Sequence, residues 1–228
     1  MIDRIRNFLR SESEKLEGRP LREKLEYIRD YYWLWILSFV SIVSLVSFVS
    51  YRALTTPKDH WFYLTLANTR AELGNGSELW DGYVKYTGYD LKQKLVDFNS
   101  DSYFDYGKNH AAGNRYYEIF VSLTDAGVMD AVTMEPDNLK SLGESGRLLD
   151  LNSDKCASIR QKYGDRFLYA IPLDKEYSED PVPVGIDISD SILMKDYQIY
   201  ADGCALGICA YSGNLDAVEK FLDYVLAD

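Results

Sequence analysis

The run of the sequence that most resembles a reactive or binding site is an acidic stretch from Asp97 to Asp105. Its side-chain oxygens fall at positions 1, 3, 5 and 9 of a calcium-binding loop. Ser102 stands where that loop needs glycine, and Lys108 stands where it needs a bidentate acid. We therefore predict a solvated loop between a strand and a helix, with calcium as the weaker alternative.

A second acidic pair, Asp187 and Asp190 in the segment GIDISDS, has the spacing of two carboxylates that share a site. Aspartate and serine also commonly open turns and cap helices, here before Ile192. The interpretation as a turn or a helix cap is favoured. The two histidines, His60 and His110, lie far apart, and no nucleotide loop, nucleophile elbow or H-E-x-x-H motif is present. We predict no enzyme, no metal and no cofactor.

The three cysteines are Cys156, Cys204 and Cys209. If residues 204–209 form one strand, five steps separate the last two by roughly 16 Å, too far for a disulfide. Buried free thiols are the default prediction. Pairing of Cys156 with one of the others remains the alternative.

Composition and charge narrow the possible functions. The chain has 228 residues, of which 46% are hydrophobic and 14% aromatic, so it must form a packed core. Residues 1–30 carry 8 basic and 7 acidic side chains, a net charge of +1, whereas residues 53–228 carry 16 and 29, a net charge of −13. A domain of that charge repels phosphate backbones, so no nucleic-acid partner is expected.

Residues 31–51 contain no charge, proline or glycine, and a helix of this length spans roughly 30 Å, the thickness of the hydrocarbon core of a bilayer. Tyr31, Tyr32, Trp33 and Trp35 at its start are typical of an interfacial aromatic belt. A buried helix of a soluble protein would be polar on one side. We predict a transmembrane helix over residues 31–52, with the lipid bilayer as its partner.

The flanks of this segment predict its orientation. Thirty residues precede the apolar run, and Ser50-Tyr51-Arg52 offers no small-x-small cleavage pattern, so an uncleaved anchor is favoured over a signal peptide. Five basic residues precede the span closely and three follow it: Lys15, Arg19, Arg22, Lys24 and Arg29, then Arg52, Lys58 and Arg70. The positive-inside rule then predicts a cytoplasmic helical segment over residues 1–30 and an extracellular remainder.

Two further patterns lie in and before the span. Serine recurs every third residue at Ser38, Ser41, Ser44, Ser47 and Ser50. Small hydroxyl residues let membrane helices approach, although each can instead bond to its own helix, so at most a weak homodimer is expected. Ile2, Ile5, Phe8 and Leu9 give an amphipathic stretch that suits the inner membrane surface.

Beyond a stalk of residues 53–59, residues 60–228 have the length of one domain. Apolar runs typical of strands occupy residues 62–67, 94–98, 129–134, 167–173, 182–188 and 205–211. Helical patterns occupy residues 78–88, 114–127, 136–146, 154–164 and 214–226, the last with Asn214 as its expected N-cap. This alternation predicts a three-layer α/β domain with a largely parallel sheet.

Several short motifs resemble those of type 2 extracellular solute-binding proteins. They occupy residues 126–132 (AGVMDAV), 142–151 (LGESGRLLDL), 169–173 (YAIPL), 206–208 (LGI) and 214–224. About twenty residues separate Leu151 from Tyr169, too few for the second lobe that closes over a solute in hinged binding proteins. The resemblance therefore implies a single lobe of that fold.

Such a lobe on a membrane anchor suits a non-catalytic sensor, accessory or scaffold protein at the cell membrane, with another membrane or cell-surface protein as its partner. The alternative is a functional receptor of a transport system for a sugar or peptide. Open α/β sheets place ligands at the carboxyl ends of their strands. The candidate ligand-binding residues there are Asn68, Arg70, Glu135 and Asp187.

Overall fold

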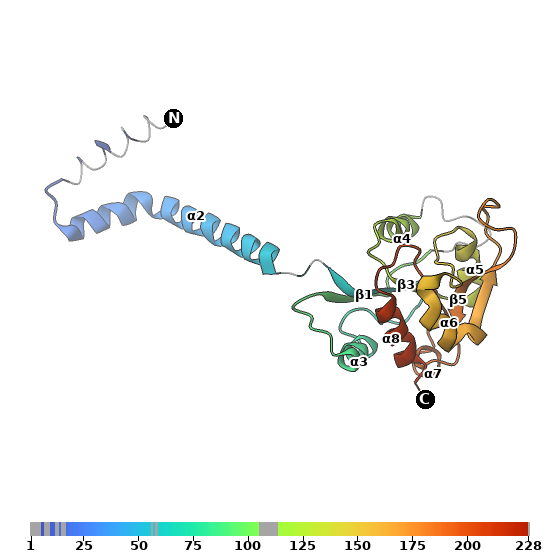
Figure 1. Ribbon diagram of the computed structural model, residues 1–228. Coiled ribbons are helices and arrows are strands. Elements are labelled where there is room, and N and C mark those ends of the chain that lie inside the picture. Colours follow the sequence, from blue (N-terminus) through green and yellow to red (C-terminus); the bar gives the residue numbers. More distant parts are fainter. Residues whose placement is uncertain are drawn as a thin grey trace. The chain divides into compact units, whose positions relative to one another are not determined.

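The computed structural model describes residues 6, 10–11, 14, 17–55, 57, 59–104 and 114–227. The chain divides into two compact units, Met1–Thr56 and Pro57–Asp228 (Figure 1). The amphipathic stretch predicted from Ile2 to Leu9 lies almost wholly outside the described residues, as do Asp105, Lys108 and His110.

The first unit contains the long helix α2, Leu21–Thr55, which begins directly after Pro20. Its sequence contains no internal glycine or proline, so nothing interrupts the helical hydrogen bonds. One segment of it, Arg29–Arg52, is long and apolar enough to cross a membrane, and none of its most apolar window is buried in the structure. A signal sequence near the N-terminus passes the same test of length and composition.

The second unit is an α/β domain (Figure 1). It is built on one sheet of six strands in the order β2-β1-β3-β6-β5-β4. The strands are β1 His60–Leu66, β2 Leu95–Asn99, β3 Ala131–Met134, β4 Phe167–Ala170, β5 Val182–Asp187 and β6 Ala205–Ile208. Each lies within a segment predicted as a strand or extends it by one or two residues. The prediction of an α/β domain is confirmed.

The prediction that the sheet is largely parallel is wrong, because the sheet is mixed. β1 pairs in parallel with β2 and β3, whereas β3 with β6, β6 with β5 and β5 with β4 are antiparallel. The strand-helix alternation predicted crossovers, but residues 171–181 between β4 and β5 contain no helix. A connection without a helix allows adjacent antiparallel strands, and a parallel pair needs a longer crossover.

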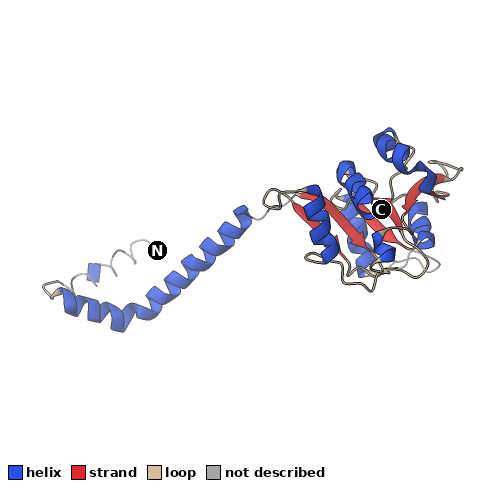
Figure 2. Cartoon of the chain, turned by 90° about the horizontal axis from the view of Figure 1, so that it is seen from below, coloured by secondary structure: helices blue, strands red, loops and turns tan. Residues whose placement is uncertain are grey.

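Helices cover both faces of the sheet (Figure 2). One apolar cluster joins the sheet to α3 Glu78–Thr87, α6 Ala157–Tyr163, α7 Ile192–Lys195 and α8 Leu215–Val225. A second cluster joins it to α4 Arg115–Asp125 and α5 Pro136–Glu144. Short 3-10 turns, η1 Asp154–Cys156 and η2 Gly164–Arg166, flank α6. The domain is thus a three-layer sandwich with a core on each side of the sheet.

Candidate functional site

The four residues predicted as ligand-binding lie toward one edge of the sheet. β1, β3 and β5 run in the same direction, since β6 is antiparallel to both β3 and β5, so their carboxyl ends share an edge. Asn68 and Arg70 follow β1, Glu135 follows β3, and Asp187 ends β5. The topology therefore brings the carboxyl ends of these strands to one edge.

Local hydrogen bonds already engage three of these side chains. Asn68, which adopts a left-handed φ of 63°, donates to the carbonyl of Phe104 at 2.6 Å and accepts from its amide at 2.8 Å. Glu135 accepts from the amide of Ala201 at 3.3 Å. Asp187 accepts from the amide and hydroxyl of Ser189 at 2.9 and 2.6 Å. Arg70 is exposed.

A buried tyrosine lies where β1 and β3 end. The hydroxyl oxygen of Tyr200 lies 2.7 Å from the carbonyl oxygen of Ala67 and 2.8 Å from that of Thr133. Burial raises the pKa of this hydroxyl well above its usual value, with the nearby Cys204 thiol adding to the shift. The phenol therefore occupies the space between these two strand ends, and none of the four predicted residues lines either pocket described next.

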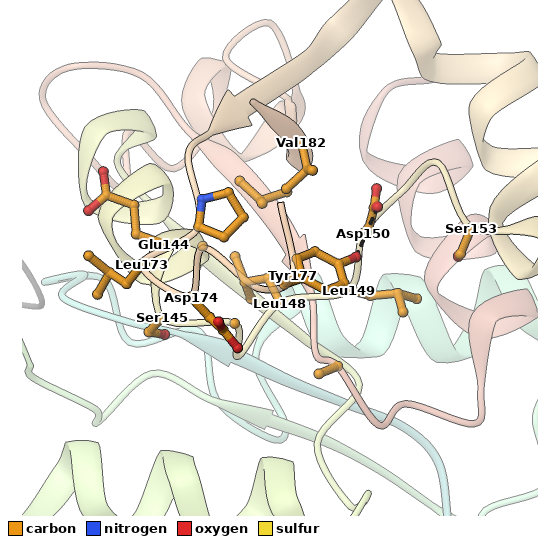
Figure 3. A pocket seen from close by; sticks show the side chains of 15 residues that line it. Glu144, Ser145, Leu148, Leu149, Asp150, Ser153, Leu173, Asp174, Tyr177 and Val182 are labelled. Carbon is orange, nitrogen blue, oxygen red and sulfur yellow. Dashed lines mark hydrogen bonds between the residues drawn. The ribbon is translucent and has the colours of Figure 1, made fainter. Parts of the chain in front are cut away.

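A pocket with distinctive chemistry lies at the opposite edge of the sheet, where β5 begins and β6 ends. Figure 3 shows the side chains that line it. Its volume is about 580 Å³, within the range of small-molecule and side-chain sites. The lining comes from the end of α5, the segment after it, the β4–β5 connection, β5 itself and the segment after β6: Gly143, Glu144, Ser145, Gly146, Leu148, Leu149, Asp150, Ser153, Pro172, Leu173, Asp174, Tyr177, Val182, Val184 and Ala210. We call it the acidic pocket.

Backbone hydrogen bonds hold the first wall of the acidic pocket in place. Gly146 takes a left-handed φ of 73°, which turns the chain after α5 at little cost because glycine has no Cβ. The amide of Leu149 donates to the carbonyl of Ile208 at 2.8 Å, and the amide of Leu151 donates to the carbonyl of Pro183 at 2.9 Å. The segment carrying Asp150 is therefore fixed to the ends of β6 and β5.

The β4–β5 connection forms the facing wall. The amide of Leu173 donates to the carbonyl of Glu144 at 2.8 Å, which ties the connection to the end of α5. Asp174 accepts from the amide of Glu176 at 2.9 Å, and its carbonyl accepts from the amide of Tyr177 at 3.2 Å. This local turn directs the Tyr177 ring toward Asp150 (Figure 3).

Three carboxylates, those of Glu144, Asp150 and Asp174, give the pocket its charge. None of the 15 lining residues is lysine, arginine or histidine, and within the described residues none of the three carboxylates forms an ion pair. The Tyr177 hydroxyl donates to Asp150 at 3.0 Å, while the amide of Asn152 donates to the other oxygen at 2.8 Å. Burial, followed by this contact with Asp150, raises the pKa of Tyr177.

The remaining lining is apolar or already satisfied. Leu148 and Val184 are buried and form an aliphatic wall with Val182 and Pro172. The Ser145 hydroxyl donates to the carbonyl of Leu142 at 2.6 Å. Among these contacts no base adjoins the hydroxyl, so nothing here activates it as a nucleophile. Three carboxylates beside an aliphatic wall give the pocket the composition of a binding site for a cation that carries apolar groups.

A second pocket, of about 590 Å³, lies beside the start of α8. Trp61 and Tyr89 stack there with ring centroids 5.0 Å apart. Lys94 lies over the Trp61 ring and Lys220 over the Tyr89 ring, each at 5.0 Å. These cations already occupy aromatic faces that would otherwise be available for stacking.

The acidic motifs noted in the sequence do not converge. Asp190 is bound by the Arg166 guanidinium at 2.5 and 2.9 Å, whereas Asp187 turns to Ser189. The bond from the amide of Ser189 to Asp187 forms a turn, in agreement with the turn that the prediction included, whereas Ser191 at the start of α7 makes no side-chain cap bond. At the start of the calcium-like run, Asp97 is held by His60 at 2.7 Å and by Asn75 at 2.6 Å.

The three cysteines are free and buried, which confirms the default prediction and excludes the alternative pairing of Cys156. Burial raises the pKa of Cys209 to about 12 and raises that of Cys204 as well. Because the thiolate is the reactive form, neither thiol is a candidate nucleophile.

The acidic pocket was not found from the sequence, although two signals pointed to it. Residues 174–181 concentrate acidic side chains around Tyr177, and Gly146 is the last residue of a predicted helix, where glycine is typical of a turn. About thirty residues separate these signals, and only the fold shows that they share a cavity. No protein-family model, curated protein or solved structure matches the chain.

Proposed function

We propose that this protein is a membrane-anchored binding protein. Helix α2 spans the membrane with residues 1–30 in the cytoplasm, and the α/β domain lies outside the cell. There the domain acts as a sensor, accessory or scaffold component by binding another membrane or cell-surface protein, without catalysis. The resemblance to one lobe of a type 2 solute-binding protein is consistent with a binding role.

The observation that carries the proposal is the exposed apolar helix joined directly to a folded domain. The segment Arg29–Arg52 shows none of its most apolar window buried, so a bilayer is the environment that best satisfies it. Only residues 56–59 separate the end of α2 from β1, so the domain is confined to the vicinity of the membrane. A domain so confined favours partners in the same membrane, because tethering raises their effective concentration.

A second candidate, a receptor that delivers a solute to a transport system, is favoured by one observation. The acidic pocket has a volume suited to a small molecule. This pocket lies at the edge opposite Asn68, Glu135 and Asp187. Substitutions in the pocket should abolish binding of a solute held there, whereas substitutions of these three residues should abolish binding of a solute held at the opposite edge.

The serine residues of α2 suggest how strongly the protein associates with itself. Hydrogen bonds between membrane helices contribute about 0.6 kcal/mol each on average. We therefore expect at most a weak homodimer through Ser41, Ser44 and Ser47.

Carbonate extraction of a doubly tagged protein tests the anchor. With one epitope tag at each terminus, we expect both tags on a single band that stays in the membrane pellet. A cleaved signal sequence would separate the two tags, and a peripheral protein would move to the supernatant. Either result contradicts the proposal.

The matched variants for this experiment change the centre of the span. Ile42→Arg with Leu45→Arg places two charges in the hydrocarbon core, each costing about 2.5–3.5 kcal/mol on insertion scales, and should prevent stable integration. Ile42→Leu with Leu45→Ile keeps the hydropathy and should behave as the parent chain.

A further inference from the structure

Large apolar side chains are exposed beside the acidic pocket. Tyr169, Ile171 and Leu173 alternate along β4 and the residues after it, with exposed fractions of 52, 46 and 60%, while Ala170 and Pro172 between them are buried. Alternate residues of an extended segment lie on one side, so these three form a row. With Tyr177, which is 60% exposed, we call this row the β4 rim.

The β4 rim is continuous with the acidic pocket, because Leu173 and Tyr177 belong to both. β4 is also an edge strand of the described sheet, where it pairs with β5 alone. Exposed apolar groups gathered at one place on a domain commonly mark an interaction surface. A small solute inside the pocket would leave Tyr169 and Ile171 uncovered, whereas a protein segment could cover them.

The charge of the pocket selects the chemistry of that segment. Glu144, Asp150 and Asp174 have no basic neighbour in the pocket lining. Helix α5 ends at Glu144 with no basic residue in its last turn, so its negative dipole end lacks a compensating side-chain cation. The same charge argues against docking on an anionic lipid surface.

We propose that the acidic pocket and the β4 rim together dock a segment of a partner protein in which a lysine is flanked by apolar residues. The lysine ammonium enters the pocket among the three carboxylates, and the flanking side chains cover the rim. Lysine suits the site because its compact ammonium has three donors that can reach separate carboxylates, whereas arginine favours one carboxylate in a planar fork. This inference rests on the proposed function, because it names the chemistry of the partner.

Asp150 retains acceptor capacity for such a ligand. Each of its oxygens accepts one hydrogen bond, from Asn152 or Tyr177, and a carboxylate oxygen can accept a second. Asparagine at this position keeps the size of the side chain and removes the charge. The variant therefore tests attraction to the ammonium with little change in shape.

The experiment is isothermal titration calorimetry on the full chain in neutral phosphatidylcholine nanodiscs, with empty nanodiscs as the blank. The probe is the pentapeptide Ser-Leu-Lys-Leu-Ser with an acetylated N-terminus and amidated C-terminus. Its matched control carries Nε-acetyllysine, which removes the charge of the ammonium and adds an acetyl group. We expect the control peptide, and the Asp150→Asn/Asp174→Asn variant with the original peptide, to bind at least tenfold more weakly.

Two further variants separate the pocket from general electrostatics. Asp196→Asn/Asp202→Asn makes the same change of net charge on exposed residues near the opposite edge of the sheet, and affinity should stay within twofold. Leu173→Ser should weaken binding at least threefold through the rim. Circular dichroism checks that each variant is folded, and Asp174→Asn alone replaces the double variant if that variant unfolds.

Several results would overturn the inference. These are no binding of the peptide, equal binding of the acetyllysine peptide, or equal losses in the pocket variant and the matched charge variant. If butylamine bound as tightly as the peptide, the ligand of the pocket would be a free amine and not a segment of a partner protein. A failure of the proposed membrane anchor is detected separately from a failure of the pocket. Carbonate extraction does not depend on the pocket, and peptide binding can be measured in detergent micelles whether or not α2 spans a membrane.

Discussion

Asp130 illustrates how single residues hold the domain together. Its carboxylate is fully buried and accepts from the amide of Tyr63 at 2.9 Å, the hydroxyl of Ser212 at 2.7 Å and the amide group of Asn214 at 3.2 Å. These donors come from β1 and from the segment before α8. One carboxylate therefore joins three parts of the chain that are far apart in sequence.

Asn214 shows what sequence patterns omit at this scale. The residue occupies the predicted N-cap position of α8, but its side chain makes no cap bond and instead donates to Asp130. Local propensity identified the helix start. The competing tertiary partner could not be read from the neighbouring residues, because it lies 84 positions away.

Replacement of Asp130 by asparagine should destabilise the separate domain, residues 57–228, by about 2 kcal/mol at pH 7. The new amide group would face donors that need an acceptor, and buried donors without partners are costly. Urea unfolding measures the loss, and the exposed Asp202→Asn serves as the control, with an expected change within about 0.5 kcal/mol.

The pH dependence of this loss has a defined sign. Burial raises the folded-state pKa of Asp130 above its unfolded value. The stabilisation linked to its protonation is then full below the unfolded pKa, about 3.9, and is lost as pH rises through the folded pKa. Asparagine does not titrate, so the difference in unfolding free energy between parent and variant should be larger at pH 4 than at pH 7. A difference that grows with pH would contradict this assignment.

At the scale of elements, periodicity predicted where the strands and helices lie. Apolar runs and helical spacing depend on neighbouring residues, so they can be read locally. Strand direction depends on which strands become neighbours, and β6 inserts between β3 and β5 although both precede it in the chain. The acidic pocket depends on that same arrangement, which explains why its residues were not predicted.

Glycine lets α5 pack closely on the sheet. A Cβ at Gly143 would lie 2.5 Å from a methyl carbon of Val184, and one at Gly185 would lie 2.5 Å from a methyl carbon of Leu139. Such distances are far below van der Waals contact. Side chains at either position would push the helix away from β5 and alter the acidic pocket.

Gly143→Ala should therefore destabilise the domain by about 1 kcal/mol or more, even though alanine favours a helix over glycine. In a Val184→Ala background the contacts with the two methyl carbons, at 2.5 and 3.0 Å, disappear and the contact with Cβ at 2.7 Å remains, so the same substitution should cost less than in the parent chain. Urea unfolding of the four proteins of this cycle measures the coupling, which we expect to be at least about 0.5 kcal/mol. Gly213→Ala, where a Cβ meets nothing within 4 Å, is the matched control. Additive effects at Gly143 and Val184 would refute the close-packing explanation.

At the scale of the whole molecule, the chain combines an apolar helix with an acidic α/β domain. The helix is long and apolar enough to cross a membrane, and the domain carries the acidic pocket and the β4 rim. The long apolar helix was predictable because its signal is a continuous stretch of composition. The acidic pocket was not, because its side chains are assembled from several distant segments.

The most direct test of this account is the accessibility of single cysteines to a membrane-impermeant maleimide in intact cells. Glu17→Cys and Ser158→Cys place thiols at exposed positions on the two sides of α2, and the chain with only its buried native cysteines is the blank. We predict labelling of the Ser158→Cys protein alone in intact cells, and of both variants after permeabilisation. Labelling of Glu17→Cys with protection of Ser158→Cys, or protection of both, would contradict an external binding domain.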